Sequence, residues 1–271
     1  MDLSVVVVTY NSEKYVHNCL SSIGRAARNL DHELWVVDNH STDRTLEILR
    51  RSPDSLGLIK NRENVGFARA VNQGLRRSSG DFCLLINPDS AIHSDSLEPL
   101  IHFMRSRPQI GVCGCKLCNH DGSLQYSKGS FPTLFSTLWR IILPGRMRKY
   151  HFLGYNEIHT CDWVTGAFMV IRKPLLEKLG YFDENYFIYY EDVDFCLKAR
   201  KAGVETCYFP PVITYHFNPH ALSNGNPGVA REIRKSRLYY FQKNQTRISH
   251  SILSFLTRHV EERFFEGNPS V

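Results

Sequence analysis

LSVVVVTY, residues 3–10, is a continuous apolar run rich in β-branched residues. It lacks the polar and apolar alternation of a strand that has one face in water. Such a run is typical of a strand covered on both faces, as in a parallel sheet flanked by helices. The run leads into Thr9, Tyr10 and Asn11, three residues with hydrogen-bonding side chains.

Strand and helix patterns alternate after this run. Val16, Leu20, Ile23 and Ala27 have helical spacing. Next come a strand ELWVVD (33–38), a capped helix STDRTLEILRR (41–51), a helix NVGFARAVNQGLRRS (64–78), a strand DFCLLIN (81–87), a helix through Leu97, Leu100, Ile101 and Met104, and a strand IGVCGCKL (110–117). This alternation predicts an α/β fold, with a central and mostly parallel sheet, right-handed crossovers and flanking helices.

The pattern changes after about residue 120. Residues 130–155 are aromatic, carry four basic and no acidic residues, and are interpreted as an inserted amphipathic segment. A strand, a short helix, a loop and a second helix follow within residues 161–203, and the last recognisable strand is ETCYFPPVITYHF (205–217). We therefore expect one compact domain over residues 1–220 and a basic amphipathic C-terminal helical extension over 221–271.

Composition limits the class of protein. The chain has 271 residues and a net charge of +6, with neither a secretory leader pattern nor an apolar stretch long enough to span a bilayer. We expect a cytoplasmic protein whose eight cysteines are reduced. Cys113, Cys115 and Cys118 are better explained as small buried residues than as half of a zinc site, because no clear partner cluster follows.

The positive charge is concentrated near the C-terminus. Residues 230–260 hold seven Lys or Arg and one acid, Glu232, interleaved with apolar residues. This pattern fits a basic surface that meets anionic lipid or nucleic acid. It fits a helix pair packed on the core with a solvated basic face equally well, so both interpretations stay open.

Polar residues follow the predicted strands. Asp38 and Asn39 end one strand, and Asn87, Pro88 and Asp89 end another. Open α/β sheets bind ligands at the carboxyl ends of their strands, although Asp, Asn and Pro are also ordinary turn residues. A carboxylate that Pro88 helps to aim would suit Mg²⁺ or Mn²⁺ bound to a diphosphate.

An acidic helix start is the second candidate. Glu191, Asp192 and Asp194 open the helix in YYEDVDFCLKAR, where a single acid would be explained by the helix dipole. Three close carboxylates repel one another, which favours a site that takes up protons, metal or hydroxyl groups. His216, at the end of the last strand, is a candidate metal ligand beside Asp89.

Taken in order, these motifs resemble inverting glycosyltransferases of family 2 with the GT-A fold, within their rhamnosyltransferase-like bacterial group. The resemblance covers roughly residues 3–217. It rests on VVVVTYNSEKYVHNCLSSI (5–23), VVDNHSTDRT (36–45), NVGFARAVNQG (64–74), LLINPDS (84–90), WVTGAFMVIRK (163–173), YFIYYEDVDFCLKARKAG (186–203) and TYHF (214–217).

The resemblance implies a role for each matching residue. Asp192 would be the general base, Asp89 and His216 would bind Mg²⁺ or Mn²⁺, and Asp38 would accept the N3 hydrogen of a pyrimidine. Thr9, Tyr10, Asn11, Asn64, Gly66, Arg69 and Asn87 would lie around the nucleotide and its diphosphate, and Glu191, Trp163 and Gly166 would shape the acceptor side. Asn87 stands where a full Asp-x-Asp metal motif would have its first acid.

Relatives of this kind use a nucleotide-diphospho-sugar of the dTDP or UDP type. The resemblance implies transfer of L-rhamnose from dTDP-rhamnose to a saccharide, often linked to polyprenyl diphosphate, in synthesis of a bacterial surface polysaccharide or O-antigen. UDP-GlcNAc, UDP-glucose and UDP-galactose are the alternative donors. Peripheral contact with the inner face of the cytoplasmic membrane would bring such an enzyme to its acceptor.

Two other classes compete with this interpretation. A sugar-nucleotide pyrophosphorylase would need a glycine-rich phosphate loop near the N-terminus, and VVTYNSEKY has no glycine. A binding protein without catalysis is disfavoured by the retained acids and His216. The basic stretch also lacks any recognised nucleic-acid module, so no nucleic-acid partner is expected.

Overall fold

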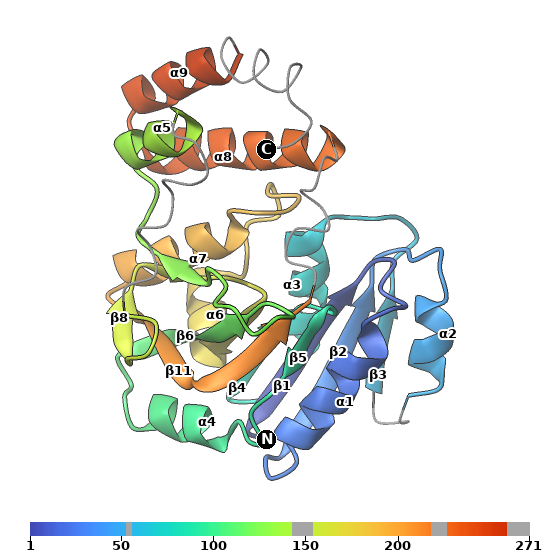
Figure 1. Ribbon diagram of the computed structural model, residues 1–271. Helices are drawn as coiled ribbons and strands as arrows, with labels where there is room; N and C mark the ends of the chain where they lie inside the picture. The colour runs from blue at the N-terminus through green and yellow to red at the C-terminus, as the bar shows by residue number, and fades with distance from the viewer. Residues whose placement is uncertain (53–55, 143–153, 218–226, 259–271) are drawn as a thin grey trace.

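The computed structural model describes residues 1–52, 56–142, 154–217 and 227–258 (Figure 1). The first half forms these elements: β1 (Leu3–Thr9), α1 (Val16–Ala26), β2 (His32–Asp38), α2 (Thr45–Arg50), β3 (Leu56–Lys60), α3 (Phe67–Arg77), β4 (Phe82–Ile86), β5 (Ser90–Ile92), α4 (Glu98–Arg105) and β6 (Ile110–Cys118).

The second half is more irregular. Its elements are β7 (Lys128–Gly129), α5 (Leu134–Ile142), β8 (His159–Cys161), β9 (Trp163–Val164), β10 (Phe168–Arg172), α6 (Lys173–Leu179), α7 (Glu191–Lys201), β11 (Glu205–His216), α8 (Pro227–Asn244) and α9 (Arg247–Leu256). The expected domain boundary at residue 220 lies in 218–226, outside the described residues.

One twisted sheet organises the protein, in the order β3-β2-β1-β4-β10-β6-β11-β5, with β8 beside β11. Strands β3, β2, β1 and β4 are parallel, and so are β6 and β11. Strand β10 lies antiparallel between β4 and β6. The predicted α/β class, with a central mostly parallel sheet and flanking helices, is confirmed.

Helices cover both faces of the sheet, as the opening run predicted. On β1, Leu3, Val5 and Val7 pack on one face, where α1 and α4 lie. Val6 and Val8 pack on the other, where α3, α6 and α7 lie. Each face therefore has its own apolar cluster, and the carboxyl ends of β1, β2 and β4 meet at one edge (Figure 1).

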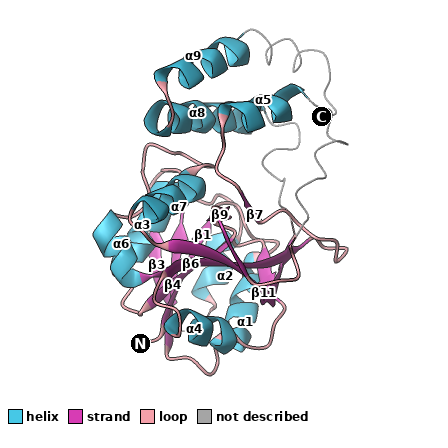
Figure 2. Ribbon diagram, turned by 90° about the vertical axis from the view of Figure 1, so that its left-hand side faces the viewer, coloured by secondary structure: helices cyan, strands magenta, loops and turns pink. Residues whose placement is uncertain are grey.

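Helices α5, α8 and α9 form a layer of their own beyond this edge of the sheet (Figures 1 and 2). Tyr240 and Phe241 of α8 are completely buried and belong to the apolar cluster of α3, α6 and α7. The predicted C-terminal helical extension is therefore present. Its first helix packs on the core.

The sequence patterns did not predict strand β3, and they did not explain the two prolines in the last strand. The short strand β3 has no distinctive pattern in LGLIK, and its position at the sheet edge comes only from pairing with β2. Pro210 and Pro211 lie inside β11, where the register with β6 shifts between Phe209 and Ile213. A bulge at this point tolerates prolines, because no regular ladder bond is required there.

Candidate active site

Asp89 and His216 meet although 126 residues separate them in sequence. Strand β5 pairs antiparallel with β11, with Ser90 opposite His216, and the backbone N–H of Phe217 donates to the carbonyl of Asp89 at 2.8 Å. His216 Nε2 consequently lies 3.2 Å from Asp89 Oδ1 and 3.3 Å from Asn87 Nδ2. Sheet register thus builds the predicted pair.

Gln125 fixes the orientation of His216. Its Oε1 lies 2.7 Å from His216 Nδ1, and its Nε2 donates to Asn119 Oδ1 at 2.9 Å. Because a carbonyl oxygen accepts, the neutral imidazole carries its hydrogen on Nδ1 and leaves the Nε2 lone pair toward Asp89. The sequence held no signal for Gln125, since an isolated Gln in a loop has no diagnostic spacing.

The donor set fits a divalent cation shared with a substrate. The described residues include no group of three His, Cys, Asp or Glu arranged to hold a metal by themselves. One carboxylate and one imidazole nitrogen are nevertheless suitable ligands for Mn²⁺ or Mg²⁺, which commonly take the rest of their coordination from substrate phosphates and water. The hydrogen bond from His216 Nδ1 to Gln125 is of the kind that orients metal-binding histidines.

The expected nucleotide residues lie at the ends of β1 and β2. Thr9 Oγ1 donates to Asp38 Oδ1 at 3.0 Å, and the Ser41 N–H donates to Asp38 Oδ2 at 3.1 Å. Asp38 is almost fully buried, whereas Tyr10 is exposed. Asn11 has a φ of 50° and accepts from the Thr42 N–H at 2.8 Å. The loops after the two strands are therefore tied together, and each Asp38 oxygen keeps a lone pair.

Asn39, which was not among the predicted site residues, links the neighbouring loop. Its buried amide donates to Asn64 Oδ1 at 2.8 Å and accepts from the Val65 N–H at 3.0 Å. Gly66 has a φ of 86°, and a Cβ there would lie 2.7 Å from the Phe187 carbonyl oxygen. Only glycine fits this close approach without strain.

Arg69 lies on α3, away from these hydrogen bonds. Its Nε is 3.4 Å from Glu184 Oε2, and Arg76 contacts the other oxygen of the same carboxylate at 3.0 Å. A diphosphate would therefore compete with Glu184 for Arg69.

Asp192 lies at the start of α7 and faces the loop before β10. Its Oδ2 accepts from the Gly166 N–H at 3.0 Å, and its Oδ1 accepts from the Val193 N–H at 2.8 Å. The Asn87 N–H donates to the Ala167 carbonyl at 3.1 Å, so this loop joins the base candidate to the strand end at Asn87. Gly166 orients Asp192 through its backbone.

Burial raises the pKa of the Asp192 carboxyl, although the hydrogen bonds from Gly166 and Val193 oppose the shift. Burial also raises the pKa of Glu191 well above its usual value, and the neighbouring Asp192 raises it further. Glu191 is buried, and its Oε2 has no hydrogen-bond partner among the described residues. A raised pKa suits a group that takes a proton near neutral pH.

The third acid of the motif has a different environment. Asp194 Oδ2 accepts from Lys243 Nζ at 2.8 Å, and its Oδ1 accepts from the Asn244 amide at 2.7 Å. Lys243 also contacts Asp183 Oδ2 at 2.7 Å. Asp194 thus anchors α8 to α7. The helical spacing could have shown this, because residues two apart on a helix are rotated by about 200°.

Tyr189 was missed in the sequence. Burial raises the pKa of its hydroxyl, and the carboxylates of Glu191, Asp89 and Asp192 raise it further, so both ends of the site act electrostatically on Tyr189. Tyr189 and Tyr190 have φ angles of 67° and 69°, an uncommon and strained backbone for non-glycine residues. Strain of this kind is concentrated at functional sites.

Trp163 lies farther from these groups. Its indole N–H donates to the Ser130 carbonyl at 2.9 Å, and its ring contacts Tyr126. It therefore connects the segment before α5 to β9.

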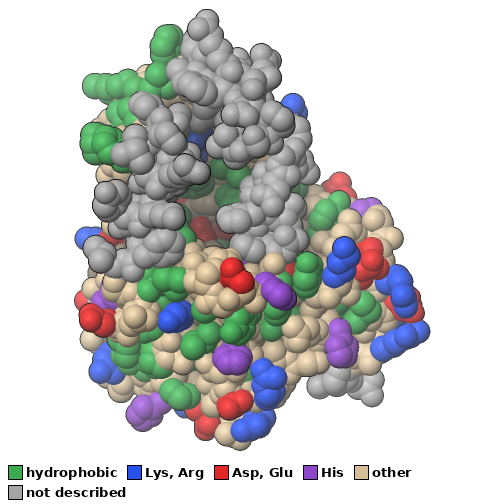
Figure 3. All heavy atoms as spheres, viewed as in Figure 1, with side chains coloured by type: hydrophobic (Ala, Val, Ile, Leu, Met, Phe, Trp, Pro, Cys, Tyr) green, Lys and Arg blue, Asp and Glu red, His purple; other side chains and the backbone are tan. Residues whose placement is uncertain are grey.

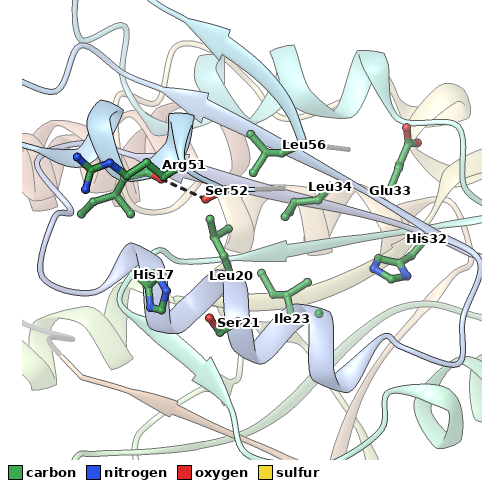
Figure 4. Close-up of a pocket in the computed structure, with 12 residues that line it drawn as sticks. His17, Leu20, Ser21, Ile23, His32, Glu33, Leu34, Arg51, Ser52 and Leu56 are labelled. Atoms are coloured by element: carbon green, nitrogen blue, oxygen red, sulfur yellow. Dashed lines mark hydrogen bonds between the residues drawn. The ribbon is translucent and has the colours of Figure 1, made fainter. Parts of the chain in front are cut away.

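Acidic side chains are visible below the helical layer (Figure 3). A separate groove of about 690 Å³ lies between α1 and α2 and includes His17, Leu34 and Arg51 (Figure 4). None of the predicted site residues lines this groove. We therefore place the candidate site at the carboxyl edge of the sheet.

The chain is similar in sequence to a known family and to curated proteins. The family model of glycosyl transferase family 2 matches residues 4–180. Among curated proteins, the low-salt glycan biosynthesis hexosyltransferase Agl10 of Haloferax volcanii is 29% identical over 224 residues, covering 80% of this chain and 68% of its own. The N-acetylglucosaminyl-diphospho-decaprenol L-rhamnosyltransferase of Mycobacterium tuberculosis is 26% identical over 237 residues, covering 81% and 77%.

Solved structures show the same fold. S. aureus TarS 1–349 in complex with UDP-GlcNAc has a TM-score of 0.61 at 22% identity and covers 96% of this chain and 73% of its own. GalNAc-T7 with UDP, GalNAc and Mn²⁺ has a TM-score of 0.66 at 15% identity, covering 99% and 58%. Among the described helices of the present chain, none has the length and hydrophobicity needed to cross a membrane.

The family model, the rhamnosyltransferase relative and the shared fold agree with the motifs first quoted from the sequence. The chain belongs to glycosyltransferase family 2, in its rhamnosyltransferase-like group, and has the GT-A fold.

Proposed function

We propose that the protein is an inverting glycosyltransferase that moves L-rhamnose from dTDP-rhamnose to a hydroxyl of a saccharide linked to polyprenyl diphosphate. The observation that carries the proposal is the arrangement of two polar ends at one edge of the sheet. Asp89 and His216 form one end, and Asp192, held by Gly166, forms the other. The rhamnosyltransferase relative, which is named for a decaprenol-linked acceptor, supports the choice of donor and acceptor.

The reaction follows from the chemistry of these residues. The acceptor oxygen attacks the anomeric carbon while Asp192 takes its proton, and the bond from that carbon to the diphosphate oxygen breaks as the nucleoside diphosphate leaves. A single displacement inverts the anomeric configuration. The raised pKa of Asp192 favours proton uptake, and the Gly166 N–H keeps the carboxylate in position.

Asp89 and His216 would hold Mg²⁺ or Mn²⁺. A bound cation would neutralise the negative charge of the diphosphate. His216 would offer its Nε2 lone pair to the cation, because its Nδ1–H donates a hydrogen bond to Gln125 Oε1. Asp38 would use a remaining lone pair to accept the N3–H of thymine or uracil, and Thr9, Tyr10, Asn11, Asn64, Gly66, Arg69 and Asn87 would surround the nucleotide.

On the acceptor side, Glu191, Trp163 and Gly166 would define where the saccharide enters. A polyprenyl-linked acceptor lies at a membrane surface, so we propose peripheral contact with the cytoplasmic membrane in synthesis of a surface polysaccharide. We retain residues 1–220 as the proposed catalytic domain, with 221–271 as an extension that packs on it through α8.

A donor screen tests the proposal. Thermal shift and hydrolysis would be measured with Mg²⁺ or Mn²⁺ for dTDP-rhamnose, UDP-GlcNAc, UDP-glucose, UDP-galactose and GDP-mannose. We expect stabilisation and turnover with dTDP-rhamnose. Preference for a UDP-sugar would replace the donor but keep the reaction class. No response to any pyrimidine sugar nucleotide would exclude the transferase proposal.

A further inference from the structure

Exposed apolar side chains project from α5 and α9 of the helical layer. Phe135 and Trp139 of α5 are 75% and 54% exposed, and Ile248 and Ile252 of α9 are 73% and 39% exposed. Within each helix the two residues are four positions apart, so they lie on the same side of that helix. We call these four residues the α5–α9 face.

The opposite sides of the two helices already pack on the protein. Leu138 of α5 packs against the cluster of α3, α6 and α7, and Leu253 of α9 is completely buried in it. A water-exposed helix normally turns polar residues outward once its apolar stripe is buried. Here α5 and α9 contact each other, and hydrophobic side chains gather over them (Figure 3). Such a patch marks an interaction surface.

The charges near this face favour an anionic partner. Neither α5 nor α9 contains an acidic residue, and Arg247 is exposed at the start of α9. Arg258, two residues beyond the end of α9, is also exposed. Aromatic and aliphatic side chains flanked by basic residues are the composition that binds at the boundary between lipid headgroups and acyl chains.

A second copy of the chain fits this face less well. A twofold contact places the same surface on both partners, so each copy would bring Arg247 and no acid on α5 or α9 to answer it. A bilayer containing anionic lipid supplies both the missing negative charge and an apolar interior. An anionic bilayer therefore matches the charge of this face better than a second copy of the chain does.

Helix α8 is not part of this surface. Tyr240 and Phe241 are completely buried, and Lys243 is paired with Asp183 and Asp194. Of the two interpretations of the basic stretch, packing on the core therefore describes this part of α8. The exposed apolar side chains of α9, by contrast, remain available to a partner.

We propose that the α5–α9 face rests on the surface of an anionic lipid bilayer. Ion pairs from α8 to α7 hold the helical layer in place, so a bilayer on this face would lie at a fixed position relative to Asp192. The role of this membrane contact rests on the proposed function, because it would bring the enzyme to an acceptor located in that bilayer. The binding itself does not require donor, acceptor or metal.

Co-sedimentation of the full chain with phosphatidylcholine vesicles, with and without phosphatidylglycerol, tests the proposal. We expect binding that depends on phosphatidylglycerol and weakens with salt. The double variants Phe135→Ser/Trp139→Ser and Ile248→Ser/Ile252→Ser should each lower vesicle affinity about tenfold or more, because two apolar contacts with lipid are lost. Ile158→Ser, at an exposed apolar residue outside the helical layer, should bind as the unmodified chain does.

Two controls make the result decisive. Circular dichroism should show intact secondary structure in both double variants, and turnover of a water-soluble acceptor should be unchanged. Unchanged vesicle binding in both variants, or no binding by the unmodified chain, would overturn the proposal. A dimer that both variants disrupt, without phosphatidylglycerol-dependent binding, would assign the face to a second copy. If vesicle binding is as expected but no sugar is transferred, the proposed function fails while this inference stands.

Discussion

The two ends of the candidate site are built from different kinds of structure. Asp89 and His216 are joined by the pairing of β5 with β11, and Gln125 is hydrogen bonded behind the imidazole. Glu191 and Asp192 lie at a helix start that follows two strained tyrosines. The first end depends on sheet register, whereas the second depends on how α7 is held.

Helix α8 provides much of the support for the second end. Ser236 donates to the Ile188 carbonyl at 2.8 Å, and Tyr239 donates to Asp183 Oδ2 at 3.0 Å. Lys243 and Asn244, about one turn beyond Tyr239, bind Asp194. These contacts share one side of α8 and enclose the segment that precedes Asp192. A helix distant in sequence therefore helps to position the proposed base, whereas the sheet positions the proposed metal ligands.

The strongest test of this comparison separates Asp192 from Asp194. Asp192→Asn should lower kcat by about 10² to 10⁴-fold, because the proposed proton acceptor is lost, while donor affinity is retained. Asp194→Asn should mainly lower stability, because its oxygen contacts with Lys243 and Asn244 are altered. Steady-state kinetics, donor titration and urea unfolding measure both variants. Equal kinetic losses with equal stability would show that the two acids do not have separate roles.

Removing the cation from α8 should have the next largest effect. Lys243→Met leaves the buried Asp194 without its partner, so the free energy of unfolding should fall by about 2 kcal/mol. The double variant Lys243→Met/Asp194→Asn should recover part of this loss. Urea unfolding of both variants measures the difference, and an unchanged midpoint for Lys243→Met would contradict the anchoring role.

The contact between Lys243 and Asp183 predicts a pH effect. Burial alone would raise the pKa of Asp183, but hydrogen bonds from Lys243, the Asn185 N–H and Tyr239 lower it to about 2. Its contribution to stability is therefore present above its ordinary pKa of 3.8 and is lost as pH falls through about 2. In Lys243→Met the folded-state pKa of Asp183 should lie closer to 3.8, so this loss should be smaller and should be complete at a higher pH, which acid unfolding at matched ionic strength would detect.

A smaller effect is expected at the other end of the site. Gln125→Met removes the acceptor that fixes the His216 tautomer, so Mn²⁺ affinity should fall about tenfold. Gln125→Glu keeps an acceptor and should retain most of the affinity. Calorimetric titration of Mn²⁺ in the presence of nucleoside diphosphate measures both. Equal affinity in all three proteins would mean that Gln125 does not position the ligand.

The smallest effect concerns Glu191. Its folded-state pKa is raised, so its contribution to stability is full below its usual value of 4.5 and is lost as pH rises through the raised pKa. Glu191→Gln cannot ionise and should flatten this decline. Thermal unfolding across pH, with Glu177→Gln at an exposed acid of α6 as control, measures the change. The prediction fails if Glu191→Gln and the unmodified chain lose stability in parallel.

The sequence by itself determined the fold class and the chemical character of the site. The apolar run that opens the chain has the composition of a doubly covered strand, and Asp38 and Asp89 follow strands directly. These features are local, because strand periodicity and turn chemistry are set by neighbouring residues. The acids of α7 were visible for the same reason, although their separate environments were not identified.

Only the tertiary structure decided which of these residues meet. Asp89 and His216 depend on the register of two strands that are far apart in sequence. Asp192 and Asp194 differ because one faces Gly166 and the other faces Lys243, and neither partner is near in the chain. Gln125 had no sequence signal, and the α5–α9 face was visible only as two separate amphipathic stretches, because its two helices are brought together by packing between distant segments.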